Sequence, residues 1–392
     1  MFPLYNFSAF HAQNFVNVDQ TERGYNVIVA KVGYSFAIDP YTGIAELAVT
    51  PKQPELIFAD KYNNESAFAS TYAESDFVLY KPMLDIVVNA IAYAPMERKA
   101  AYFPVAISVG DYKKKLMACG ERYWQREALG WTLSKAEAVD HLPLQYEYAF
   151  GGSGTNLSYE QSNESNPQDI SILHNPIGRG FYSESFLKSA FRQRTFPAHQ
   201  IDNPANPVRY PIELVLPQGL GCYSRYFASR IALGGTANQN WVEQHAPLLP
   251  HDFSMRYWNG AHPDLQVAHF KPNHLYDFVL TGLVPDSIAP KQTFSFQLPV
   301  ETLFVQLYTA ENLVLCRDLI LDTVRIDVEQ KQIDCTYRRA FPEEIAIEKA
   351  ELRYILRNER GAQIELAKEI QNNPQQFTYG LPRPPSLQNI AY

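Results

Sequence analysis

The chain has 392 residues, of which 46% are hydrophobic and 19% charged, and its formal net charge is −8. This composition excludes an intrinsically disordered chain, and the negative charge argues against nucleic-acid binding, which normally requires a basic face. Aromatic residues make up 13%, and 27 prolines outnumber 19 glycines. Because Tyr and Phe suit strands and Pro interrupts helices, the composition favours a mainly β protein with long ordered loops.

Residues 1–130 are expected to form a first β unit. Alternating apolar and polar residues predict strands, and Gly110-Asp111 between two alternating runs predicts a tight hairpin turn. The predicted strands cover residues 26–38, 45–49, 76–93, 105–109 and 112–119.

The stretch DFVLYKPMLDIVVNAIAYAP, residues 76–95, is predicted to enter a core with two covered sides. Apolar residues alternate first and then merge into a nearly continuous run, which is typical of buried strands. Lys81, Pro82 and Asp85 interrupt the stretch, so it is not a membrane-spanning helix.

Residues 131–270 have a different character and are predicted to be rich in loops. Ser134 and Glu137 have the spacing of a capping box, which predicts a short helix to about His141. A second modest helix is expected over residues 184–194. Segments rich in Gly, Pro, Asn and Ser follow at residues 151–156, 158–169, 203–211 and 234–240. Long loops of this kind, when they carry aromatic residues, are commonly functional.

A second β unit is expected over residues 271–370, followed by an extended tail at 371–392. Its predicted strands cover residues 276–281, 293–298, 303–308, 313–315, 324–328 and 332–337. Residues 347–370 are interpreted as a final hairpin, although 343–359 also suit a helix. The predicted fold is therefore mainly β, with two β-sandwich-like units flanking a loop-rich central segment with short helices.

The four cysteines lie far apart in the sequence and form no CxxC pair, which favours buried free thiols in a reducing compartment. The N-terminal residues lack the basic and apolar regions of a signal peptide, and no apolar stretch is long enough to cross a membrane. A cytoplasmic location is expected.

Signatures of catalysis are sparse. The sequence contains no HExxH, Walker or GxSxG motif, and the GGSG at residues 151–154 is interpreted as a turn. His262, His269 and His274 lie near Asp264, but their spacing matches no known ligand pattern. The sequence therefore predicts no catalytic residue, no metal and no cofactor.

Two segments are candidates for binding. In NPIGRGF, residues 175–181, two glycines allow close approach around Arg179, which suits either a clamp for a partner or a pin between loops. In LPHDFSMRYWNG, residues 249–260, aromatic residues surround an acid and a base, as in binding hot spots or in a buried loop anchor. The candidate residues of this second segment are Asp252, Phe253, Arg256, Tyr257, Trp258 and Asn259.

Four motifs in series resemble the domain-of-unknown-function family 2169. They are residues 77–95, YEYAFGG at 146–152, NPIGRGF at 175–181 and LPHDFSMRYWNGAHPDLQ at 249–266. Within these motifs Tyr148 stands where the family pattern usually has Arg. Members of the family resemble adaptor-chaperones of bacterial type VI secretion systems. The resemblance implies a non-enzymatic protein that binds an effector and helps to load it on the spike, made of a VgrG-type trimer and a PAAR-type cone.

Two other functions are consistent with the sequence. A β protein rich in aromatic residues can stack sugars, so a carbohydrate-binding or carbohydrate-active protein is the main alternative, although no pair of carboxylates stands out. A structural component of the secretion apparatus is the third possibility.

Overall fold

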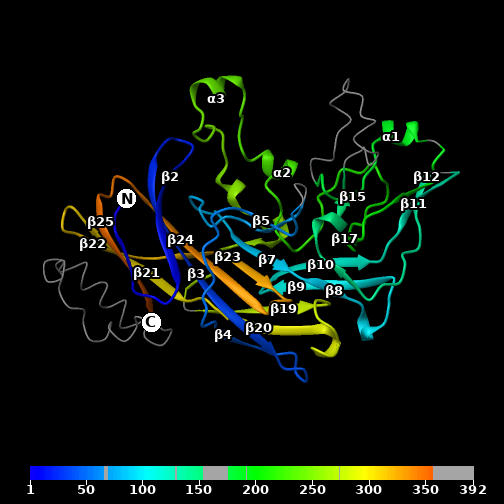
Figure 1. Ribbon diagram of the computed structural model, residues 1–392, viewed down its shortest axis with the longest axis horizontal. Helices are drawn as coiled ribbons and strands as arrows, with labels where there is room; N and C mark the ends of the chain where they lie inside the picture. The colour runs from blue at the N-terminus through cyan, green and yellow to red at the C-terminus, as the bar shows by residue number, and fades with distance from the viewer. Residues whose placement is uncertain (66–68, 129, 153–174, 191, 273, 356–392) are drawn as a thin grey trace.

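The computed structural model describes residues 1–65, 69–128, 130–152, 175–190, 192–272 and 274–355. Within these ranges strands dominate and helices are few and short, so the predicted mainly β class is confirmed (Figure 1). The expected loop at 158–169 and the expected tail at 371–392 lie outside the described residues. No helix among the described residues is long and apolar enough to cross a membrane.

The largest sheet has seven strands. Six of them follow in the order β18 (Gln266–Val267), β7 (Leu84–Asn89), β23 (Ile320–Asp327), β24 (Gln332–Pro342), β3 (Gly24–Ile38) and β2 (His11–Val18), and β4 (Ala45–Val49) also pairs with β3. A five-stranded sheet has the order β17 (Ile201–Asp202), β10 (Tyr112–Cys119), β9 (Tyr102–Val109), β19 (Leu275–Thr281) and β20 (Thr293–Pro299).

Smaller sheets complete the fold. A four-stranded sheet contains β1 (Leu4–Asn6), β25 (Ile347–Ile355), β21 (Thr302–Thr309) and β22 (Val314–Asp318), and a three-stranded sheet contains β12 (Gly130–Leu133), β11 (Tyr123–Glu127) and β16 (Thr195–Pro197). Two-stranded pairs are β13 (His141–Pro143) with β8 (Ile91–Tyr93), β14 (Phe150–Gly151) with β15 (Arg179–Gly180), and β5 (Lys61–Tyr62) with β6 (Thr71–Ala73).

The helices in the described part of the chain are all short. The α-helices are α1 (Glu184–Ser189), α2 (Ala228–Ile231) and α3 (Gln239–Gln244), and the 3-10 turns are η1 (Pro95–Glu97), η2 (Tyr146–Tyr148), η4 (Met255–Trp258), η5 (Pro263–Leu265) and η6 (Pro290–Gln292). Ser183 and Asn238 cap α1 and α3 with their side chains. In Figure 1, α3 projects away from the sheets on the side where β2 also ends.

The two expected β units are not separate in the structure. Strands from residues 1–130 and from residues 271–370 share both large sheets, because β3 pairs with β24, β7 runs parallel to β23, and β9 pairs with β19. The sequence interpretation grouped strands that follow one another along the chain. The observed sheets instead join strands more than 160 residues apart, which period-two alternation alone cannot indicate.

One apolar core lies between the two large sheets. The side of the seven-stranded sheet that carries Ile28, Ile86 and Ile326 is fully buried within this core. Phe36 of β3 stacks on Phe294 of β20 with ring centroids 5.8 Å apart, so the sheets meet through aromatic contacts. The four-stranded sheet adds its own residues to the same core.

Local predictions fared differently. The hairpin of β9 and β10 and that of β23 and β24 are confirmed, with Gly110 at a φ of 56° in the first turn. The expected helix from Ser134 is wrong, because the Ser134 side chain accepts a hydrogen bond from the Tyr123 backbone N–H instead of capping a helix. In the described part of 184–194 the expected helix forms over α1, and the described part of 343–359 contains strand β25.

The predicted strand at 76–93 is only partly correct. Residues 84–89 and 91–93 form β7 and β8, whereas residues 76–83 are irregular although several of them are buried. Pro82 lacks a backbone donor for a ladder, and Asp76 and Lys81 are engaged in buried ion pairs. This irregular segment lies over the face of the seven-stranded sheet that is turned away from the apolar core.

Candidate functional site

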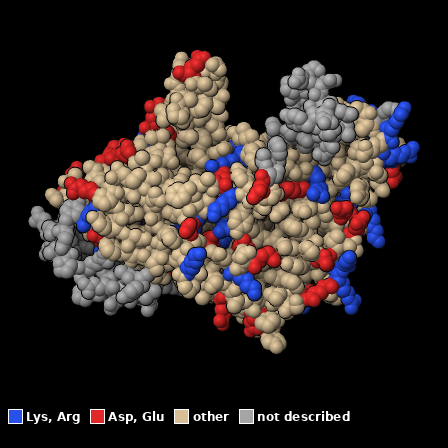
Figure 2. Space-filling model, in the orientation of Figure 1, with Lys and Arg blue, Asp and Glu red and all other residues tan. Residues whose placement is uncertain are grey.

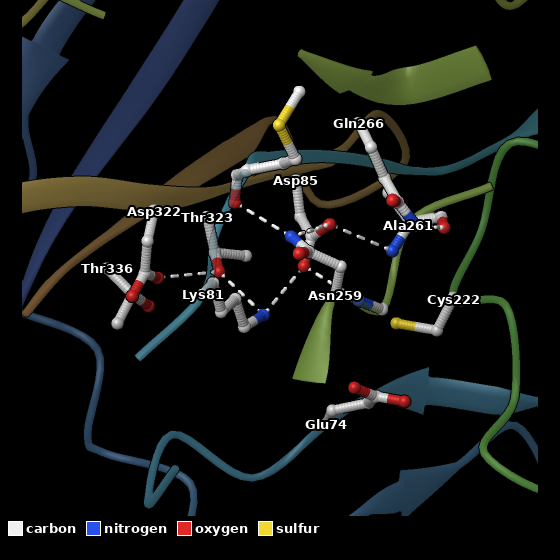
Figure 3. A network of polar contacts seen from close by, with 12 residues as sticks. Glu74, Lys81, Asp85, Cys222, Asn259, Ala261, Gln266, Asp322, Thr323 and Thr336 are labelled. Atoms are coloured by element: carbon white, nitrogen blue, oxygen red, sulfur yellow. Dashed lines mark hydrogen bonds and ion pairs between the residues drawn. The ribbon is translucent and has the colours of Figure 1, made fainter. Parts of the chain in front are cut away.

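Asp85 is the centre of a buried polar network that joins two of the sequence motifs (Figure 3). Its carboxylate is fully buried and accepts from Lys81 Nζ at 2.8 Å and from Asn259 Nδ2 at 3.0 Å. It also accepts from the backbone N–H groups of Gly260 and Ala261, at 2.7 and 3.2 Å. One carboxylate on β7 therefore fixes the backbone that follows residues 249–258.

Arg230 holds the same segment from a second side. This buried guanidinium of α2 forms an ion pair with Glu74 and donates to the backbone carbonyls of Tyr223 and Tyr257. Burial acts to raise the pKa of Glu74, but the charges of Arg230 and Arg225 outweigh it and the net pKa is lowered. Glu74 is thus held as a carboxylate, and Arg230 is held in place beneath η4.

The candidate residues at 252–259 divide into anchors and surface residues. Phe253 and Asn259 are buried, and Asn259 also donates to the Met83 carbonyl at 2.7 Å. Asp252 and Arg256 are exposed, and Asp252 binds the backbone N–H and the hydroxyl of Thr236 at 2.8 and 2.7 Å. Among the described residues, Asp252 and Arg256 form no ion pair with each other.

Tyr257 and Trp258 are half-buried, so their exposure is intermediate between that of the anchors and that of the surface residues. Their rings are 5.2 Å apart and each contacts Phe253, at 5.4 and 5.5 Å. Arg225 lies over the Trp258 ring with its Cζ 5.4 Å from the centroid. The segment thus presents aromatic edges from a backbone that is fixed underneath. Binding by these residues stays a prediction.

The aromatic edges continue into a larger surface. Tyr257 and Trp258 pack with Phe15 around a small buried cluster that contains Leu79 and Phe253. Phe15 contacts Phe77 at 5.1 Å, and Phe77 stacks on Phe58 at 4.5 Å. Phe58 is 68% exposed. We call Phe15, Phe58, Phe77, Tyr257 and Trp258 the aromatic surface.

Ion pairs line the face of the seven-stranded sheet that residues 76–83 cover. Register places side chains of neighbouring strands on this one face, since Thr323 is opposite both Asp85 and Thr336, and Lys31 is opposite Thr336. The buried pairs are Lys31–Asp76, Lys81–Asp85, Arg325–Asp334, Arg338–Asp322 and, beside them, Arg230–Glu74.

A cavity of about 30 Å³ lies among these charges, which is room for one or two water molecules. Burial lowers the pKa of Lys31, and Asp76 opposes that shift. Burial also raises the pKa of Asp322, although Arg338 and Lys81 act against it. Each charge in the face is neutralised by a neighbour, so the arrangement serves to hold the covering segment in one position.

Arg179 joins the second and third sequence motifs. Its Nε donates to the Glu147 carbonyl and its Nη1 to Gln200 Oε1, both at 3.0 Å, while the guanidinium lies 4.6 Å from the Tyr148 ring. The side chain of Asn175 donates to the Tyr146 carbonyl at 2.8 Å. The geometry fits the pin between loops, and the partner-binding role of Arg179 stays a prediction.

The three histidines weighed as metal ligands do not converge. His262 is buried and lies within 3.1 Å of Lys114 Nζ, and His269 places both ring nitrogens 3.1 Å from backbone carbonyls of Leu321 and Lys81. His274 is exposed. Burial and the charge of Lys114 lower the pKa of His262 to about 3, so this imidazole is neutral.

A larger cavity, about 260 Å³, lies where β7 and β23 end. Asp327 and Glu329 line it, but Asp327 accepts from the Tyr72 hydroxyl at 2.6 Å and Glu329 lies 3.3 Å from the Tyr93 hydroxyl. Hydrolysis of a glycoside needs one carboxyl group as an acid and another as a nucleophile or base. Both carboxylates here are engaged as hydrogen-bond acceptors.

Acidic and basic side chains are interspersed on the face shown in Figure 2. Within the described part of this face, Lys and Arg form no continuous basic surface, in keeping with the net charge of −8. The electrostatics of this face therefore do not favour a polyanionic ligand.

Some residues of the site had a signal in the sequence and others did not. Lys81 and Asp85 stand out as charges within an apolar run, and that run is the one that holds Asn259. Phe58 and Arg230 lie in stretches without periodicity, so nothing in the sequence indicates that one is exposed beside Phe77 and the other buried.

Comparison with known proteins places the chain in a family. Neither a curated protein nor a solved structure matches it significantly. A family described as an uncharacterized protein conserved in bacteria, DUF2169, matches residues 22–338. These residues include Asp85, Arg179 and the whole 249–260 segment. The resemblance found in the four motifs is therefore confirmed, and the chain belongs to the DUF2169 family.

Proposed function

We propose that this protein is a non-enzymatic cytoplasmic adaptor-chaperone that binds a type VI secretion effector and helps to load it on the VgrG/PAAR spike. The observation that supports the proposal is the aromatic surface, which is held on a backbone fixed by Asp85 and Arg230. The link to the secretion system comes from the resemblance carried by the four motifs.

The chemistry of the aromatic surface suits the recognition of another protein. Aromatic residues and Arg are enriched in binding hot spots, and hot spots are surrounded by polar residues that exclude water. Arg256 and Asp252 are exposed beside Tyr257 and Trp258 and would form such a rim. Because the backbone is already ordered by buried hydrogen bonds, little conformational entropy would be lost on binding.

A polar rim also suits the release that an adaptor requires. An interface of moderate size with charged edges binds more weakly than a core-like obligate interface. The client would be covered in the producing cell and released when the spike is assembled. The surface offers partly exposed rings, and Phe58 is the most exposed of them.

The test is capture of partners by the tagged full chain from its own bacterium, with mass spectrometry to identify them. Wild type is expected to recover a toxin-domain protein together with a PAAR or VgrG module. Trp258→Ala should weaken binding of the purified effector about 30-fold or more, as expected for a hot-spot residue worth about 2 kcal/mol, and Arg256→Ala in the rim should weaken it by a smaller factor.

Tyr41→Ala is the matched control, because Tyr41 is 90% exposed in the turn between β3 and β4. It should bind the effector as wild type does. If Trp258→Ala and Arg256→Ala lower Tm by many degrees while binding per folded molecule is unchanged, both residues are structural anchors and the site is wrong. Recovery of neither effector nor spike protein, together with binding on a glycan array, would contradict the adaptor function.

A further inference from the structure

Three side chains with metal-ligating atoms meet where the α3 arm, residues 234–250, reaches the turn between β2 and β3. They are Glu22 of that turn, His245 directly after α3, and His251. One ligating atom from each lies within 4.8 Å of the others. Two of these residues are 223 or more positions from the third, so the fold creates this cluster and no sequence spacing indicates it.

Hydrogen bonds to backbone carbonyls determine which nitrogen each imidazole presents. His245 Nε2 is 2.8 Å from the Leu249 carbonyl oxygen, and His251 Nδ1 is 3.3 Å from that of Gln20. A carbonyl only accepts, so both of these nitrogens carry the hydrogen. His245 Nδ1 and His251 Nε2 are therefore left with lone pairs, in the pattern by which proteins orient histidines that bind a metal.

One ligating atom of each of the three residues lies in a single small region. His245 Nδ1 is 3.5 Å from Glu22 Oε1, and the two imidazole rings have centroids 4.4 Å apart. Two ligands about 2.1 Å from a tetrahedral Zn²⁺ would be separated by roughly 3.4 Å. Acceptors this close repel one another unless a cation, either a metal ion or a proton on one imidazole, lies among them.

We propose that Glu22, His245 and His251 bind a divalent first-row transition metal, best matched by Zn²⁺. Imidazole and carboxylate ligands suit this metal, and two histidines with one glutamate leave a fourth position for water. Hard cations such as Mg²⁺ prefer sites made of oxygen and are not expected to bind. The site differs from the aromatic surface and does not depend on the proposed adaptor function.

Binding would connect the α3 arm to the β2–β3 turn. Among the contacts described, the hydrogen bond between His251 and the Gln20 carbonyl already links these two segments, and His245 lies beside Glu22. Asp252, which binds Thr236 across the base of the arm, follows His251 directly. A metal at this position would therefore order the arm next to the 249–260 segment.

The test is isothermal titration of ZnCl₂ into the full chain after treatment with a chelator. One Zn²⁺ per chain is expected, and His251→Ala and Glu22→Gln should each weaken binding at least tenfold. His251 and Glu22 are both exposed, so these variants should fold. His274→Ala is the matched control, because it removes an exposed histidine outside the cluster, and it should bind Zn²⁺ as wild type does.

Hydrogen exchange of the α3 amides provides a second measurement. Zn²⁺ should slow exchange in Gln239–Gln244 of wild type and leave it unchanged in His251→Ala. Absence of Zn²⁺ binding would overturn the proposal. Equal loss of binding in His274→Ala and His251→Ala would also overturn it, because that result would mean that Zn²⁺ binds exposed histidines in general and not this cluster. Failure of this test leaves effector capture by Trp258 unaffected.

Discussion

Asp85 illustrates how one buried charge can position a surface segment. Its carboxylate accepts from Lys81, from Asn259 and from two backbone N–H groups, and none of its side chain is exposed. A buried ion pair contributes little net stability when both partners are present, yet removing one partner leaves an uncompensated charge. The network therefore controls where the backbone lies more than how stable the whole protein is.

Asp85→Asn should lower the free energy of unfolding by about 3–5 kcal/mol, because Lys81 would lose its counter-ion in a buried site. The amide NH2 would also replace one of the two oxygens and so place a donor toward the N–H group of either Gly260 or Ala261. Urea unfolding followed by circular dichroism measures the change. Asp111→Asn, at an exposed turn position, should change it by less than about 0.5 kcal/mol. A loss below about 1 kcal/mol for Asp85→Asn would show that the network is not coupled to folding.

At the scale of elements, the 3-10 turn η5 and strand β10 are joined by a contact that contains a titratable histidine. His262 caps η5 by accepting from the Asp264 backbone N–H at 3.2 Å, and Lys114 of β10 reaches both His262 and Asp264. Burial first, and then the Lys114 charge, lower the pKa of His262 to about 3. The packing of η5 on β10 therefore requires a neutral imidazole.

This contact predicts loss of stability in acid. An unfolded histidine takes up a proton below its ordinary pKa of about 6.5, whereas folded His262 does so only near pH 3. As the pH falls from 6.5 to 5.0, His262 alone should remove about 1.6 kcal/mol of the free energy of unfolding. Urea unfolding at both pH values should show this extra loss in wild type and not in His262→Gln. His11→Gln, at an exposed position of β2, should retain it; equal losses in wild type and His262→Gln would contradict the assignment.

At the scale of the whole molecule, each of the two large sheets contains strands from both the first third and the last third of the chain, so neither group of strands forms its sheet without the other. β3 and β7 have their partners β24 and β23 near the other end of the matched family region. Such pairings have high contact order, so folding has to bring distant segments together before the sheet is stable. The central residues 131–270 then connect strands of common sheets, and they add the short strands β17 and β18 to those sheets.

A chain that ends at residue 270 should therefore fail to fold. It would leave β3, β7 and β9 without β24, β23 and β19, and their buried apolar sides would be exposed. Thermal unfolding and gel filtration should show no cooperative transition and an aggregated product. A chain ending at residue 355 retains every described strand and should unfold cooperatively. A cooperative transition in the shorter chain would restore the division into separate β units.

The parts of this fold that depend on neighbouring residues were predictable from the sequence. Gly110-Asp111 connects strands that are adjacent in the chain, so local alternation and turn chemistry were enough. Burial of the polar face of the seven-stranded sheet was not predictable, because an alternating strand normally exposes its polar side to water. Asp76 and Lys81 cover that side. The ion-pair partner of Asp76 is Lys31 in the distant strand β3, and that of Lys81 is Asp85, on the other side of Pro82 in the sequence.

The candidate site was predictable to a similar degree. The 249–260 segment could be recognised from its aromatic residues and the four-motif resemblance. The sequence does not indicate which residues of the segment face outward. Asn259 is buried because it contacts Asp85, whereas Arg256, which lies within η4, is exposed. Phe58 joins the aromatic surface through its contact with Phe77, which is 19 positions away in the sequence.

The paired charges beneath residues 76–83 also bear on how this protein can change through evolution. Loss of Asp322 alone would strand Arg338, and loss of Arg338 alone would strand Asp322, so single substitutions there are costly. Replacement of both by apolar residues of similar volume can be neutral or even stabilising. Accepted substitutions at these positions should therefore occur as compensating double changes, and Asp322 with Arg338 should be exchanged as one unit.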